Sequence, residues 1–192
     1  MNQNKRKPLY HFLMPSDWPI WFILCLLRVN SSLSYLRQIK HGKFLGRLGH
    51  KVLSKRRAIT RRNLSLAFPE LSIKDRNKLA LEHFEAMGVS LAELGLSRWG
   101  SKEMLLENSA WEGKEYVQEA LNTGRGIILL SAHFTSLEIS GRILRYNFPE
   151  FDVVYRRNRN AFITEILRST REIYARTAIE KRDIKSMIRS LK

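Results

Sequence analysis

The stretch Gly126-Ile127-Ile128-Leu129-Leu130-Ser131-Ala132-His133-Phe134-Thr135-Ser136-Leu137-Glu138 is the most informative part of this chain. Residues 127–130 form an uninterrupted apolar run, which is typical of a strand buried on both faces, and residues 137–146 have the pattern of a helix. On one continuous helix, His133 and Glu138 would lie about 140° apart. The two side chains therefore meet only if His133 precedes the helix and Glu138 lies in its first turn.

Each of the two residues also has a simpler explanation. Thr135-x-x-Glu138 fits a capping box, in which the glutamate binds the N-cap amide, and a histidine at a strand end is often only hydrogen-bonded. The placement favours chemistry, because open α/β sheets bind ligands at the carboxyl ends of their strands, beside helix N-termini. The positive end of the helix also keeps an imidazole neutral, and therefore basic, around neutral pH.

The His-Phe-Thr-Ser-Leu-Glu segment resembles the His-x-x-x-x-Asp/Glu motif of glycerolipid-type acyltransferases, in the version of the late acyltransferases of lipid A biosynthesis. The similarity runs from about Trp18 to Lys192 and does not fix the acyl chain or the acceptor. Further stretches that are similar to this family are Asn63-Leu64 with Phe68-Pro69-Glu70, Trp99, and Tyr155-Arg156 with Asn158 and Asn160, where Arg157 replaces the usual proline.

The resemblance implies acyl transfer from an acyl carrier protein thioester to a hydroxyl of a phosphorylated glycolipid, at the cytoplasmic face of a bacterial inner membrane. His133 would be the general base, and Glu138 would orient the imidazole and stabilise the imidazolium. Arg156 follows the second predicted strand, on the same edge as His133 in a parallel sheet, and is expected to bind acceptor phosphate. Arg171 matches an arginine that the family uses near its acceptor, on resemblance alone. No cofactor is expected, and no metal, because no Cys/His cluster has zinc spacing.

The order of elements predicts an α/β fold. The resemblance implies a mixed sheet with flanking helices as in glycerolipid acyltransferases, preceded by an N-terminal membrane-anchor helix. Residues 1–40 are interpreted as a basic segment with the anchor, and residues 41–192 as the acyltransferase domain around one core. The predicted 127–130 strand, the 137–146 helix and a second strand form a β-α-β unit with a parallel pair. The remaining predicted elements are a helix from Ile73, capped by Ser72 and bent at Gly88, a helix over 115–121 closed by Gly124, that second strand over 152–155, and an amphipathic helix over 183–191.

The formal net charge of +16 predicts an anionic partner or surface. A helix predicted over residues 43–66 has a basic side and an apolar side, which suits either anionic lipid or the solvated face of an ordinary packed helix. The basic residues of this helix include Lys51, Lys55, Arg56, Arg57, Arg61 and Arg62. Later arginines expected to face solvent or membrane include Arg157, Arg159, Arg168 and Arg176.

Residues 18–27 form a strongly apolar segment with basic residues on both flanks. The segment is shorter than the roughly 20 residues of a full membrane span. It is therefore interpreted as an uncleaved anchor that either spans the bilayer, if the helix extends through Leu36, or lies at one interface. A cleaved signal peptide is the alternative, but residues 31–34 make a poor cleavage site.

Two alternatives to an active acyltransferase remain. A nucleic-acid-binding protein would explain the charge, but the sequence has no zinc-finger spacing, RNP-like aromatic strand or basic-zipper heptad, and no nucleic acid is expected. The second alternative concerns the C-terminal end. Members of the resembling family continue through another strand with a Pro-Asp segment, so the acyltransferase domain is expected to be incomplete here, and the chain would then be an inactive remnant.

Overall fold

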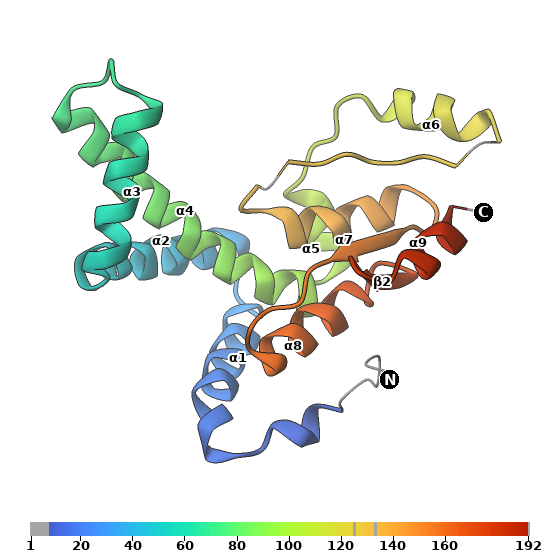
Figure 1. Ribbon diagram of the computed structural model, residues 1–192, viewed down its shortest axis with the longest axis horizontal. Coiled ribbons are helices and arrows are strands. Elements are labelled where there is room, and N and C mark those ends of the chain that lie inside the picture. The colour runs from blue at the N-terminus through green and yellow to red at the C-terminus, as the bar shows by residue number, and fades with distance from the viewer. Residues whose placement is uncertain (1–7, 125, 133, 192) are drawn as a thin grey trace. The chain divides into compact units, whose positions relative to one another are not determined.

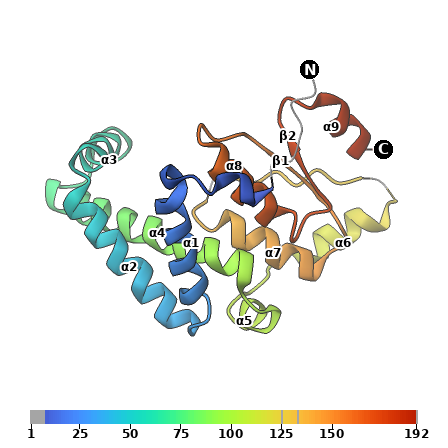
Figure 2. The same ribbon diagram turned by 90° about the horizontal axis from the view of Figure 1, so that it is seen from below.

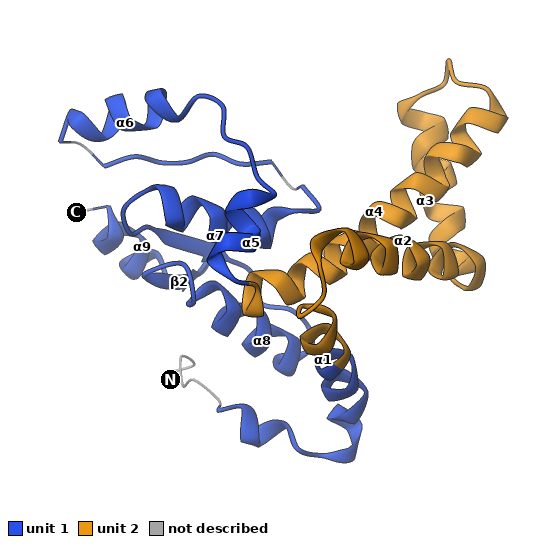
Figure 3. Cartoon of the chain, turned by 180° about the vertical axis from the view of Figure 1, so that it is seen from behind, with its two compact units in different colours: residues 1–25, 101–192 blue, residues 26–100 orange. Residues whose placement is uncertain are grey.

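The computed structural model describes residues 8–124, 126–132 and 134–191 (Figure 1). The chain divides into two compact units: unit 1 contains residues 1–25 and 101–192, and unit 2 contains residues 26–100 (Figure 3). The elements in chain order are the 3-10 helices η1 (Leu9–Phe12) and η2 (Pro15–Asp17), α1 (Trp18–Asn30), α2 (Tyr35–Val52), α3 (Ser54–Ala67), α4 (Ile73–Trp99), α5 (Lys102–Glu107), α6 (Lys114–Asn122), α7 (Leu137–Asn147), β1 (Asp152–Tyr155), α8 (Ala161–Arg171), β2 (Thr177–Glu180) and α9 (Ile184–Ser190).

In unit 2, α2 packs directly on α4 (Figure 2). A Cβ atom on Gly46 would lie 2.2 Å from the carbonyl oxygen of Phe84, and one on Gly88 would lie 2.1 Å from that of Gly42. Protein interiors cannot absorb such an overlap, so the two backbones can touch only because these positions are glycine. The sequence predicts a bend at Gly88; α4 is one continuous helix through this residue, and the glycine makes room for α2.

The ends of the unit 2 helices have identifiable causes. Ser72 caps α4 as predicted, because its hydroxyl accepts a hydrogen bond from the Asp75 N–H at 3.1 Å. The prediction of one helix over residues 43–66 is wrong, since the chain leaves helical geometry at Leu53, with φ −89° and ψ 65°, and starts again as α3. Arg57 donates to the carbonyl oxygens of His50 and Lys51, which lie in the last turn of α2 and lack helical partners.

In unit 1, β1 and β2 form a parallel pair whose register runs from Asp152 with Thr177 to Tyr155 with Glu180, and α8 connects them. The strand at β1 is confirmed. The predicted strand over residues 127–130 is wrong: Ile128 and Leu130 are 77% and 97% exposed, and the described part of the sheet contains only β1 and β2. The parallel pair therefore consists of β1 and the following strand β2, and not of residues 127–130 and β1. The structure is rich in helices and has a small sheet, which is consistent with an α/β fold.

A small aromatic core lies under α8. The rings of Phe12 and Phe162 stack with their centres 4.7 Å apart, and Ile166 completes this buried cluster. Trp21 packs on the cluster, and its indole N–H donates to the Phe12 carbonyl at 2.6 Å. The helices predicted over residues 115–121, 137–146 and 183–191 are present as α6, α7 and α9.

The predicted anchor segment forms α1, which has 13 residues. At 1.5 Å per residue such a helix is about 20 Å long, whereas the hydrocarbon core of a bilayer is about 30 Å thick. No helix in the described ranges is long and apolar enough to cross a membrane.

Candidate functional site

Glu138 lies in the first turn of α7, as the sequence predicts, and its carboxylate is held by residues far along the chain. The Nε of Arg171 donates to both carboxylate oxygens at 3.1 Å, and Nη2 of the same guanidinium donates to Oε1. The side chains of Glu138 and Arg171 are 18% and 16% exposed, respectively. Charge-assisted, forked contacts of this kind fix geometry more strongly than neutral hydrogen bonds do. The structure thus brings together two of the predicted site residues.

Tyr174 completes the cluster around Glu138. Its hydroxyl donates to Oε2 of Glu138 at 3.1 Å, and the residue is only 4% exposed. The ring occupies space left by Gly141 on α7, where a Cβ would lie 2.6 Å from the ring. Burial, followed by the negative charge of Glu138, raises the pKa of the Tyr174 phenol above its usual value, so the hydroxyl stays protonated and donates.

The last residue of β1 also reaches this cluster. The guanidinium carbon of Arg171 lies 5.8 Å from the ring centre of Tyr155, within the range of a cation–π contact. Arg156 follows, and its side chain is exposed. No hydrogen bond or ion pair joins Arg156 to Glu138 or Arg171 in the described part of the chain, so Arg156 lies beside the cluster in sequence without being one of its contacts.

His133 lies outside the described residues, and its pairing with Glu138 stays a prediction. The capping-box explanation of Glu138 does not account for its contacts. The N-cap of α7 is Ser136, whose side chain makes no cap hydrogen bond, and the Glu138 carboxylate bonds to groups 33 and 36 residues later. Glu138 is therefore a tertiary contact point between α7 and the end of α8.

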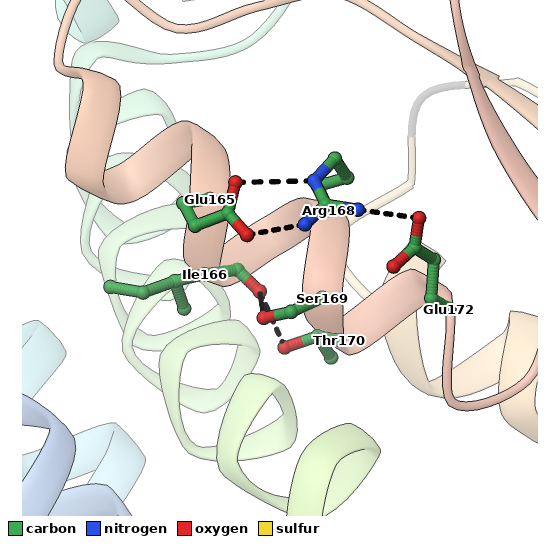
Figure 4. Close-up of polar contacts among 6 residues, drawn as sticks. All are labelled: Glu165, Ile166, Arg168, Ser169, Thr170 and Glu172. Atoms are coloured by element: carbon green, nitrogen blue, oxygen red, sulfur yellow. Dashed lines mark hydrogen bonds and ion pairs between the residues drawn. The ribbon is translucent and has the colours of Figure 1, made fainter. Parts of the chain in front are cut away.

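The helix that delivers Arg171 is itself stiffened by a second arginine. Arg168 donates from Nε to Glu165 at 3.2 Å and from Nη1 to Glu172 at 2.5 Å (Figure 4). The hydroxyls of Ser169 and Thr170 donate to the Ile166 carbonyl in the same stretch (Figure 4). Arg168 was expected to face solvent or membrane, but its side chain is only 13% exposed and is paired on both sides, which corrects that expectation.

Comparison with known proteins identifies the family. The family model described as bacterial lipid A biosynthesis acyltransferase matches residues 5–192. The chain belongs to this family. A lipid A biosynthesis acyltransferase of Haemophilus influenzae is 32% identical, over 99% of this chain and 61% of its own length.

Two lipid A acyltransferases of Escherichia coli are also similar. The lauroyltransferase is 30% identical over 94% of this chain and 58% of its own length, and the palmitoleoyltransferase is 28% identical over 94% and 59%. The chain thus spans about three fifths of the length of these relatives. No solved structure matches the chain.

The sequence of this lipid A acyltransferase family member did not lead us to predict Tyr174 as a residue of the site. The available signal was its place three residues after Arg171, just beyond the end of α8, where both side chains can reach the same group. No group of three or more histidine, cysteine, aspartate or glutamate side chains is placed to hold a metal ion within the described ranges.

Proposed function

We propose that this chain carries the acyl-transfer site of a lipid A biosynthesis acyltransferase. The acyl group would move from an acyl carrier protein thioester to a hydroxyl of a phosphorylated glycolipid. The observation that supports this most is the fixed carboxylate of Glu138, five positions after His133 in a member of this family. The names of the relatives, a lauroyltransferase and a palmitoleoyltransferase, support a fatty acyl group.

In the proposed reaction, His133 takes the proton of the acceptor hydroxyl as its oxygen attacks the thioester carbonyl. A carbon–oxygen bond forms, the carbon–sulfur bond breaks, and His133 returns the proton to the departing thiolate of the carrier. Glu138 stabilises the imidazolium between these steps. Arg171 and Tyr174 make four hydrogen bonds to the carboxylate of Glu138, so the carboxylate would act on the imidazolium through its negative charge, from a fixed position.

Arg156 is proposed to bind a phosphate of the glycolipid. Its side chain is exposed, and it directly follows Tyr155, whose ring contacts Arg171. An arginine next to the cluster but outside its ion pairs keeps its forked donors available for a planar or tetrahedral anion. Substitution by alanine would then weaken use of the acceptor far more than use of the donor, which kinetics with each substrate varied in turn can measure.

We place the reaction at the cytoplasmic face of the bacterial inner membrane. One side of α1 exposes large apolar residues at helical spacing, and the other side packs Trp21 and Leu24 on the Phe162 cluster. A helix that is apolar on both sides fits insertion into the interface of a bilayer. The exposed residues are Trp18, Phe22, Leu26 and Val29, at 54–69% exposure.

The proposal is tested by turnover of the purified chain in detergent, with an acyl carrier protein thioester and a lipid A precursor. We expect transfer that His133→Ala abolishes while the circular dichroism spectrum is unchanged. No turnover in the unsubstituted chain, as expected of an inactive remnant, would contradict the proposal. Equal turnover with and without His133 would contradict the proposed base.

A further inference from the structure

The helix α3 turns two of its large apolar side chains, Ile59 and Leu66, away from the unit to which it belongs. It packs on α2 and α4, and the residues half-buried along that side include Arg57, Thr60 and Leu64. Ile59 and Leu66 are 52% and 65% exposed, and at about 100° per residue they fall on the opposite side of the helix. Surface helices ordinarily turn their apolar residues toward the core, so α3 has the reverse arrangement.

Cations share this outward side of α3. Lys55, Ile59, Arg62 and Leu66 follow one another at intervals of four, three and four residues, and all are exposed. We name these residues the outer face of α3. The face alternates a cation with an apolar side chain over about 17 Å of helix, from 1.5 Å per residue.

The neighbouring end of α2 extends this surface. Leu48, Val52 and Leu53 are 47%, 65% and 50% exposed at the corner between the two helices. Residues 35–67, which comprise α2, the corner and α3, contain ten lysines and arginines and no aspartate or glutamate. The surface therefore has strong positive charge together with exposed apolar groups. A binding partner that fits it has to offer both negative charge and an apolar phase.

We infer that the outer face of α3, with the apolar end of α2, binds the surface of an anionic bilayer. Ile59 and Leu66 enter the boundary between headgroups and acyl chains, while Lys55 and Arg62 contact lipid phosphates. An acidic protein would complement the cations alone, whereas apolar groups at alternate positions of the face need an apolar phase. The inference goes beyond the proposed acyl transfer, and rests on it only in taking a bilayer as the source of the glycolipid.

The chain allows a single-probe test, because Cys25 is its only cysteine. In a Cys25→Ser background, Ile59→Cys carries an environment-sensitive fluorophore, and Met87→Cys on α4 is the matched control at the same 52% exposure. Phosphatidylglycerol vesicles should shift the emission at position 59 to the blue and raise it roughly twofold, without a comparable change at position 87. Phosphatidylcholine vesicles should have a much smaller effect.

Charge reversal provides an independent readout of the same inference. Lys55→Glu with Arg62→Glu should weaken binding to phosphatidylglycerol vesicles about tenfold or more. Lys74→Glu with Lys78→Glu makes the same change in net charge on α4, at two exposed residues that are not part of the outer face, and should have a much smaller effect. Equal weakening by the two pairs would overturn the assignment to α3.

Two other results would also overturn the inference. The first is no emission change at position 59 with anionic vesicles, or an equal change at position 87. The second is a change at position 59 on adding acyl carrier protein without vesicles, which would assign the face to an acidic protein. None of these readouts uses turnover, so failure of this inference and failure of the proposed acyl transfer are distinguishable.

Discussion

The two units of the chain use their basic side chains in opposite ways. In unit 1, Arg168, Arg171 and Arg176 each form an ion pair with a carboxylate. The Arg168 pair lies within α8, whereas the Arg171 pair joins α8 to α7 and the Arg176 pair joins the residue before β2 to β1. In unit 2, residues 35–67 have no carboxylate of their own, and Arg47 reaches Glu85 on α4. A high density of arginine thus serves internal structure in one unit and an outward-facing surface in the other, and composition alone does not separate the two uses.

The largest expected effect is on turnover, and it tests whether one ion pair of unit 1 serves catalysis while another serves only structure. Glu138→Gln should lower turnover by about 10²–10⁴-fold, because the neutral amide cannot stabilise an imidazolium. The matched control is Glu165→Gln, which removes a carboxylate of similar burial that also pairs with an arginine of α8. The control should keep most of its turnover. Equal losses in the two variants would mean that Glu138 acts only by holding α8 in place.

Unit 2 should instead lose stability when the close contact between the backbones of α2 and α4 is disturbed. Gly46→Val places atoms where the Phe84 carbonyl lies, so we expect unit 2 to lose about 3 kcal/mol or more of its free energy of unfolding. In the control Gly49→Ala, the new Cβ would lie 3.6 Å from the nearest atom, and a helical alanine gains about 0.5–1 kcal/mol over glycine. Denaturant unfolding followed by circular dichroism measures both. Similar stability in the two variants would show that the helices do not approach so closely.

Tyr174→Phe tests the single hydrogen bond that Tyr174 contributes to the Glu138 cluster. It removes one hydrogen bond to a charged group and leaves the packing of the ring against Gly141 intact. We expect kcat to fall about tenfold with KM nearly unchanged, and the free energy of unfolding to fall by about 1–3 kcal/mol. A fall in melting temperature with kcat unchanged would identify Tyr174 as a structural residue only.

The smallest expected effect is in the pH dependence, where the two units have opposite signs. Hydrogen bonding from Arg176 lowers the pKa of Asp152, so its contribution to stability is present above its unfolded-state pKa, about 3.9, and is lost as the pH falls through the folded-state value. Burial raises the pKa of Glu93, so the folded state binds its proton more tightly. Its contribution is therefore present in acid and is lost as the pH rises through the folded-state pKa.

The substitution Glu93→Gln allows the direction of this pH dependence of stability to be measured. The amide oxygen can still accept the hydrogen bond that Tyr35 donates to Glu93 at 3.4 Å. We expect a modest gain in melting temperature at neutral pH that disappears in acid, below about pH 4. Asp152→Asn should do the reverse, with a loss at neutral pH that disappears in acid. A uniform effect of either variant across pH would show that the carboxyl does not titrate as described.

Local signals predicted those parts of the fold that neighbours in sequence determine. Ser72 starts α4 because its hydroxyl bonds a backbone amide three residues later, and Gly124 can end α6 because it adopts a positive φ of 69°. The apolar run over residues 127–130 failed as a predictor, since burial depends on which strand lies beside it. The break at Leu53 also has no local signature, because the chain there contains neither proline nor glycine.

In the candidate site, too, the sequence predicted single residues but not the contacts between residues far apart in the chain. The spacing within α7 and a family resemblance predicted Glu138 and Arg171 separately, but neither signal indicated that the two side chains bond to each other. Their contact joins residues 33 positions apart, and it depends on how α8 lies against α7. Tyr174 belongs to no motif, and only the space left by Gly141 gives it a place beside the carboxylate.

The contact between α2 and α4 also sets how unit 2 opens. Amide protons near Gly42, Gly46 and Gly88 lie between two touching backbones, so water reaches them only when α2 separates from α4. The helix α3 is exposed along most of its length and can fray without that separation. Hydrogen exchange would then divide unit 2 into a slow helix pair and a fast third helix. The lipid-binding face would thus lie on the helix that opens most easily, free to adjust its tilt on a bilayer while the pair beneath it stays folded.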